Sequence, residues 1–123
     1  MRIFNSRWFQ RFAKKEGIAA RALVEAVLRA EAGQVDADLG GEVIKQRIAR
    51  PGQGKAKAYR TVILFRRGDK AFIVYGFSKS QRANLNDLEL RRFKEEAGYV
   101  LGLPDNLLAE LLKRGDFVEV EVR

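Results

Sequence analysis

The cations that could do chemistry gather in and beside one break between two predicted strands. An alternating apolar stretch over residues 43–49 ends at Pro51, Gly52 and Gly54, because proline lacks an amide donor and glycine frees the backbone. Five cations lie in or next to this break: Arg47, Arg50, Lys55, Lys57 and Arg60. A loop held at both ends by strands can aim charged side chains at an anionic ligand, so we predict the site here.

Metal-free RNA cleavage is the chemistry that these residue types could perform. A 2′-hydroxyl attacks its own phosphate when one group removes its proton, others neutralise the phosphorane and an acid protonates the leaving oxygen. Arg60 and Arg82 suit charge stabilisation, because a guanidinium stays protonated and donates two parallel hydrogen bonds to phosphate. Lys55 or Lys57 could act as base or acid if crowded cations favour its neutral form. DNA would resist, because it lacks the attacking hydroxyl.

Other kinds of site do not fit the sequence. A Walker A loop needs glycine where Ala49 stands and serine or threonine where Ala56 stands. Residues 43–82 contain one carboxylate, Asp69, so a two-metal nuclease would lack its ligands there. The chain has no cysteine and no histidine, which removes the usual zinc ligands and the commonest catalytic base. We therefore expect neither a metal nor a small-molecule cofactor.

The net charge of +8 is concentrated in one segment. Residues 43–82 carry eleven cations and one anion, whereas the rest of the chain carries thirteen cations and fifteen anions. Such a field attracts polyphosphates, although lysines and arginines can also simply solvate exposed strand edges. The excess of positive charge in this segment favours phosphate binding. It also indicates four further RNA-binding residues: Lys45, Arg47, Arg50 and Lys79.

Hydrophobic period and cap residues predict the elements that position these side chains. Strands are expected over residues 2–4, 43–49, 59–66, 70–77 and 117–122, and helices over 7–16, 19–32, 87–101 and 104–113. The strands at 59–66 and 70–77 are apolar on both faces and joined by a turn, so they belong inside a sheet covered on both sides. The first two helices should form a pair on one side of it. One domain over residues 1–123 follows.

Apolar side chains at helical spacing are predicted to be core. Trp8, Phe9 and Phe12 could stack nucleobases, but aromatic residues in this pattern are far more often buried. Buried stripes are also expected in the second and last helices: Leu23, Val24, Val27, Leu28, Leu107, Leu108, Leu111 and Leu112. Residues 34–42 are predicted to be a loop. No apolar run reaches the ~20 residues of a membrane span, so a cytoplasmic protein without membrane contact is expected.

Three runs resemble the RelE/HigB-like toxins of bacterial type II toxin–antitoxin systems. They are GEVIKQRIARPGQGK at 41–55, YRTVILF at 59–65 and FIVYGFSK at 72–79, and one branch of the family continues as this chain does, with SQRANL at 80–85 and a long C-terminal helix. The resemblance covers nearly the whole chain. It implies an α+β fold in which paired N-terminal helices pack on one face of a small antiparallel sheet, followed by C-terminal helices. It also implies ribosome-dependent cleavage of mRNA and a cognate antitoxin as partner.

The resemblance also assigns residues. The basic loop lysines of the family fall on Lys55 and Lys57, its strand arginine on Arg60, and its later cations on Lys79 and Arg82. One position departs: where the family has a C-terminal tyrosine or histidine, this chain has residues 82–85 and then a helix. Three tyrosines could substitute, and the sequence selects none of them: Tyr59, Tyr75 and Tyr99.

Three functions therefore stay open at this point. The first is an endoribonuclease toxin, an mRNA interferase that inhibits translation by acting on ribosome-bound mRNA. The second is a ParE-like inhibitor of DNA gyrase, because the ParE members of this superfamily have a similar fold with reduced catalytic residues, so the fold does not settle the activity. The third is a non-catalytic nucleic-acid-binding module, which would bind oligonucleotides with a steep salt dependence and leave them intact.

Overall fold

The computed structural model describes residues 1–50 and 54–122, and for Arg50 and residues 54–57 it describes the backbone alone. The strands of the described residues are β1 (Arg2–Ser6), β2 (Ala37–Gly40), β3 (Val43–Arg50), β4 (Gly54–Arg66), β5 (Lys70–Ser78) and β6 (Phe117–Val120). The helices are α1 (Arg7–Glu16), α2 (Ala20–Glu31), α3 (Asp87–Val100) and α4 (Asp105–Lys113). None of these helices is both long and apolar enough to cross a membrane.

The strands form one sheet in the order β2-β3-β4-β5-β1-β6. The central pairs β3–β4 and β4–β5 are antiparallel, as predicted for a hairpin closed by the turn at residues 67–69. The sheet is mixed, because β1 enters between β5 and β6 and runs parallel to β5. The α+β class is confirmed, with this one parallel pair in an otherwise antiparallel sheet.

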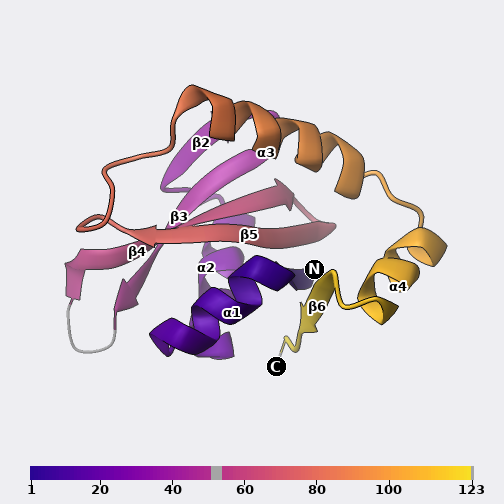
Figure 1. Cartoon of the computed structure of the whole chain (residues 1–123), viewed down its shortest axis with the longest axis horizontal. Coiled ribbons are helices and arrows are strands. Elements are labelled where there is room, and N and C mark those ends of the chain that lie inside the picture. The colour runs from indigo at the N-terminus through magenta and orange to yellow at the C-terminus, as the bar shows by residue number, and fades with distance from the viewer. Residues whose placement is uncertain (51–53, 123) are drawn as a thin grey trace.

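Helices cover both faces of the central strands (Figure 1). On one face, α1 and α2 pack against the alternate residues Ile63, Ala71 and Ile73. On the other face, α3 and α4 pack against Leu64 and Phe72 and their neighbours. A strand that is apolar on both sides requires two covering layers, and the predicted pair of N-terminal helices on one face is confirmed.

Local signals in the sequence place the ends of the helices. The hydroxyl of Ser6 accepts from the amide of Phe9 at 3.1 Å, and Gly17 closes α1 with a left-handed φ of 70°. Asn86 and Glu89 form a reciprocal capping box at the start of α3. These caps confirm the predicted helix starts at residues 7 and 87 and the predicted end at residue 16.

Three expectations from the sequence were wrong. Residues 37–40 form β2 instead of loop, because they pair with β3 at the edge of the sheet. β4 starts at Gly54, which pairs with Arg50, so Lys55 and Lys57 belong to a strand and not to a long loop. Some helical apolar residues are not core: Trp8 is 44% exposed, and Leu28 and Leu107 are also exposed. The helical period identifies one face of a helix but not how much of that face the sheet can cover.

A bulge on β5 brings α1 close to the sheet. Val62 pairs with Tyr75 while Ile63 pairs with Ile73, so Val74 is an extra residue on β5. Val74 and Tyr75 therefore both face the α3 layer. Gly76 then faces α1, where an added Cβ would stand 2.8 Å from Cε2 of Phe12 and 3.0 Å from Cε1 of Phe9.

We expect Gly76→Ala to destabilise the protein by about 1–3 kcal/mol, because the two phenylalanine rings must shift to admit the methyl group. The matched control is Gly98→Ala in α3, where an added Cβ meets no atom within 4 Å. That change should stabilise by roughly 0.5–1 kcal/mol through helix propensity. Urea unfolding midpoints measure both changes. A Gly76→Ala protein as stable as the parent would show that the rings move aside freely.

Candidate nucleic-acid interface

Two rows of side chains cross β3, β4 and β5 on the face of the sheet that α3 partly covers. Arg47, Arg60 and Phe77 stand directly opposite one another and form the first row. The next row is Lys45, Val62 and Tyr75. Opposed residues of neighbouring strands point to the same face, so Arg60 and Tyr75 lie diagonally across β4 and β5, roughly 7–8 Å apart.

Arg60 is the cation at the middle of this face. It is half-buried, and its Nη1 donates to the carbonyl of Ala58 at 3.1 Å. No ion pair to Arg60 occurs among the described residues. A half-buried guanidinium with donors still available is suited to bind a phosphate with two parallel hydrogen bonds.

Arg82 lies beside the two rows with all five of its donors engaged. Its Nη1 donates to Glu89 at 2.9 Å and to the hydroxyl of Tyr75 at 3.3 Å, and its Nη2 donates to Glu89 and to the carbonyl of Asn84. Its Nε also donates to Asn84. The hydrogen bonds that Arg82 donates to Glu89 are the main cause that raises the pKa of Arg82 above its ordinary value. Arg82 therefore fastens residues 82–86 and the start of α3 to the sheet.

Tyr75 is the tyrosine that the structure places on this face. Its hydroxyl accepts from Arg82, and its ring lies 5.9 Å from that of Phe93 and 6.0 Å from that of Phe77. Tyr59 is buried and donates to Glu16 at 2.8 Å, while Tyr99 is 64% exposed on α3. The sequence around Tyr75 does not distinguish it from Tyr59 and Tyr99, because no residue pattern marks the bulge that turns Tyr75 toward α3.

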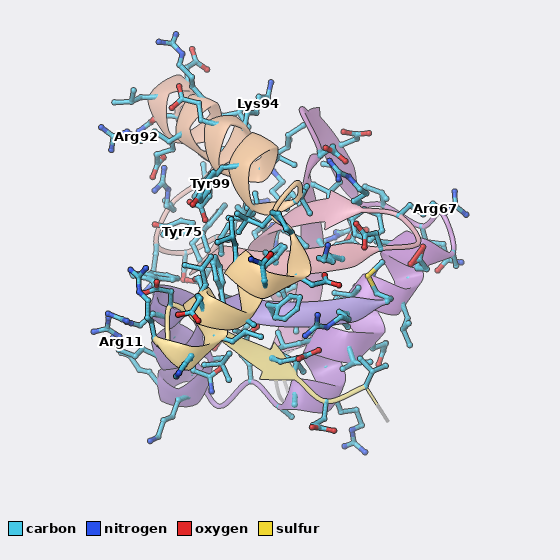
Figure 2. The ribbon with its side chains drawn as sticks, turned by 90° about the vertical axis from the view of Figure 1, so that its right-hand side faces the viewer. Arg11, Arg67, Tyr75, Arg92, Lys94 and Tyr99 are labelled. Carbon is cyan, nitrogen blue, oxygen red and sulfur yellow. The ribbon has the colours of Figure 1, made fainter. Side chains whose placement is uncertain are left out.

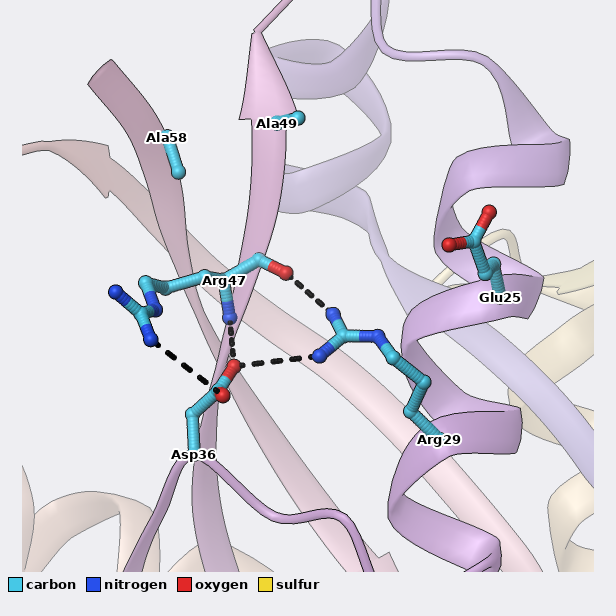
Figure 3. A pocket seen from close by; sticks show the side chains of 6 residues that line it. All are labelled: Glu25, Arg29, Asp36, Arg47, Ala49 and Ala58. Atoms are coloured by element: carbon cyan, nitrogen blue, oxygen red, sulfur yellow. Dashed lines mark hydrogen bonds and ion pairs between the residues drawn. The ribbon is translucent and has the colours of Figure 1, made fainter. Parts of the chain in front are cut away.

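Two further predicted RNA-binding residues have partners near this face. Nζ of Lys45 donates to the side chain of Asn84 at 3.1 Å. Arg47 lies in a pocket of about 240 Å³ between β3 and α2, where its amide donates to Asp36 at 2.7 Å (Figure 3). Asp36 also pairs with the guanidinium groups of Arg29, at 3.5 Å, and of Arg47, at 3.9 Å. Asp36, which lies in the segment predicted to be a loop, thus binds arginines.

The remaining predicted site residues divide into two groups. Lys79 is exposed just after the end of β5, two residues beyond Phe77. The side chains of Arg50, Lys55 and Lys57 lie outside the described residues, and only the strand backbone that carries them is placed.

Cations at the other end of the β4–β5 hairpin already have partners within the protein. Arg66 forms two hydrogen bonds of 2.9 Å with the carboxylate of Glu42, and this pairing lowers the pKa of Glu42. Arg67 donates to the carbonyl of Glu31, and Lys70 pairs with Asp69 at 3.5 Å. Arg67 and Tyr75 lie on opposite sides of the molecule in Figure 2. The positive charge available to a ligand therefore concentrates at the end of the hairpin near Arg60.

Comparison with known proteins gives one family. The family model described as the RelE toxin of the RelE/RelB toxin–antitoxin system matches residues 1–120. A search of curated proteins found no match to the chain.

We expect Glu89→Gln to destabilise the protein at pH 7 and to lose this effect in acid. The hydrogen bond from Arg82, and then the amide of Asn86, lower the pKa of Glu89 in the folded protein. A carboxyl group whose pKa is lowered on folding stabilises the folded protein at pH values above its ordinary pKa of about 4.3. This stabilisation is lost as the pH falls through the pKa that the group has in the folded protein. Glutamine can keep the capping-box contact with the amide of Asn86 through its carbonyl oxygen, while it removes the charge and one of the hydrogen bonds from Arg82.

Urea unfolding of the parent and of Glu89→Gln between pH 7 and pH 3 measures this effect. The control is Glu95→Gln, which removes the same charge from an exposed position of α3. We expect the parent and Glu89→Gln midpoints to converge in acid, while Glu95→Gln stays near the parent throughout. A gap for Glu89→Gln that persists unchanged at pH 3 would exclude the ion pair as its cause.

Proposed function

Because the chain belongs to the RelE toxin family of toxin–antitoxin systems, we propose that it cleaves ribosome-bound mRNA by attack of a 2′-hydroxyl on its own phosphate. Membership of the family implies an antitoxin protein as partner. The observation that carries the proposal is Arg60, a half-buried arginine without an ion pair among the described residues, set in a row across three strands. The ribosome and its mRNA are the proposed partners in the reaction.

Arg60 is the proposed phosphorane-stabilising residue. The reaction adds negative charge to the phosphate oxygens in the transition state, and a fixed guanidinium in a partly water-excluded site stabilises that charge. Opposed to Arg60 is Phe77, whose buried ring keeps water from one side of the row. Arg47 belongs to the same row and Lys79 follows Phe77 in the sequence, and with Lys45 and Arg50 they are the proposed contacts to neighbouring phosphates.

Tyr75 is the proposed acid for the leaving 5′-oxygen. Its hydroxyl accepts a hydrogen bond from Arg82, so its own proton is left to donate to another acceptor. In this proposal Arg82 positions Tyr75, and direct contact of Arg82 with phosphate would require the release of one of its five engaged donors. Lys55 and Lys57, near the start of β4, are the proposed candidates for the base that takes the 2′-hydroxyl proton.

Arg60→Ala should abolish mRNA cleavage and growth arrest while the fold stays intact, because it removes the guanidinium from the proposed transition-state contact. Primer extension on cellular mRNAs after brief induction measures cleavage, and we expect cuts in phase with the reading frame only for the parent. Arg67→Ala is the matched control: it removes the same side chain seven residues along the sequence, at the far end of the hairpin, and should leave the cuts in place.

Two outcomes would contradict the nuclease proposal. Growth arrest by the parent with intact mRNA and damaged DNA would direct the search to gyrase, and steep salt-dependent binding without cuts would leave a binding module. Cleavage by Arg60→Ala at the parental rate would remove Arg60 from the site. Unfolding midpoints of both variants separate loss of chemistry from loss of fold.

Tyr75→Phe should slow cleavage by about 10²-fold or more, the range of a single general acid, with ribosome binding unchanged. Single-turnover cleavage on purified, programmed ribosomes separates the chemical rate from binding. The control is Tyr99→Phe, which removes the same hydroxyl from an exposed position and should cleave at the parental rate. Equal rates for the two variants would rule out Tyr75 as the acid and leave the Arg60 assignment standing.

A further inference from the structure

An aromatic and cationic surface on α1 has no role in the proposed cleavage. Trp8 is 44% exposed although it is large and apolar. Its ring stacks on Phe12, with centroids 5.2 Å apart, and lies 4.6 Å from the ring of Tyr75. Two aromatic neighbours hold Trp8 in one orientation, so a large apolar ring is fixed in place at the surface of the protein.

The surface next to these rings is hollowed. Four residues line a hollow of about 310 Å³: Trp8, Arg11, Phe12 and Lys15. Their spacing of three, four and seven residues puts all four on one side of α1. The hollow therefore combines two aromatic rings on its floor with two long cations at its rim.

The cations of this hollow are available to a ligand. In the described part of the chain, neither Arg11 nor Lys15 forms an ion pair. The single acid of α1, Glu16, accepts a hydrogen bond from the hydroxyl of Tyr59. Arg11 projects from the molecule on the same side as Tyr75 (Figure 2).

We propose that this hollow binds an unpaired nucleotide of single-stranded RNA. A nucleobase would pack against Trp8 and Phe12, while Arg11 and Lys15 would contact the phosphates on either side of it. Stacking on aromatic rings is worth about 1–3 kcal/mol per base and tolerates any base, and nearby cations follow the backbone. An apolar protein segment would instead bury two unpaired cations at its rim, which is costly.

This site is separate from the residues proposed for cleavage but adjoins them. Trp8 touches one side of Tyr75, and Arg82 lies 6.0 Å from the centre of the same ring. A strand of RNA that crossed the Arg60 row could thus extend past Tyr75 to α1. Binding at α1 does not require that the protein cleaves RNA.

Trp8 itself reports on this site, because it is the only tryptophan of the chain. The full-length protein is titrated with an eight-nucleotide 2′-O-methyl oligouridine, which cannot be cleaved by 2′-hydroxyl attack, while tryptophan emission is followed. We expect emission to be quenched as a base stacks. An abasic oligomer of the same length and charge should bind without quenching.

Charge reversal locates the site. Lys15→Glu should weaken the oligouridine titration about tenfold or more, because it replaces an attractive phosphate contact by a repulsive one. The matched control is Lys14→Glu, which makes the same charge change at the next residue but lines a different hollow, formed with Asn5 and Leu23. It should shift the titration far less than Lys15→Glu.

Three results would overturn the inference: equal weakening by the two reversals, equal quenching by the abasic oligomer, or no quenching by oligouridine. A fourth result would be a tryptophan emission maximum that shifts with protein concentration in the absence of oligomer, which would point to a second copy of the chain on this surface. The oligouridine titration is independent of the primer-extension assay. A protein that does not cleave mRNA could still bind oligouridine at this site, and a protein that cleaves mRNA could fail to bind it there.

Discussion

The constraint on which the rest of the structure depends is the β4–β5 hairpin, whose central residues are apolar on both faces. Ile63 and Ile73 must be buried on one side, and Leu64 and Phe72 on the other. A sheet of this kind is stable only between two covering layers, and α1 with α2 and α3 with α4 supply them. β1 ends at Ser6, opposite the middle of β5, so the hairpin continues past its neighbour. The candidate site lies on the part of the hairpin that extends beyond β1.

Most of this architecture could be predicted from the sequence, because its signals are local. The caps at Ser6 and at Asn86, the turn at residues 67–69 and the two-faced strands depend on neighbours within a few residues. The parallel insertion of β1 beside β5 could not be predicted, since it joins residues about 68 positions apart with no local mark. Nor could the bulge at Val74, which decides that Tyr75 faces α3 and Gly76 faces α1.

The sequence shows the basic segment that contains the candidate site, but it does not show which cations of that segment form ion pairs. The segment covers residues 43–82, and most of the acids that pair with its cations come from elsewhere in the chain. Glu42 pairs with Arg66 and Glu89 with Arg82, each from outside that segment. Arg60 differs from both in that the described residues provide it with no carboxylate. The net charge of a sequence segment therefore indicates the kind of ligand. The ion pairs of the folded protein decide which cation of that segment is available to bind it.

Tyr75 connects the parts of this surface physically. Its hydroxyl accepts from Arg82, and its ring contacts Trp8 of α1 and lies near Phe93 of α3. Arg82 in turn holds Glu89, which caps α3. Displacement of α3 would therefore disturb the partners of Tyr75 together: Glu89 would leave Arg82, and Phe93 would leave the ring. A protein that bound α3 and drew it from the sheet could in this way change the proposed acid without touching Arg60, because the first row is built on strands alone.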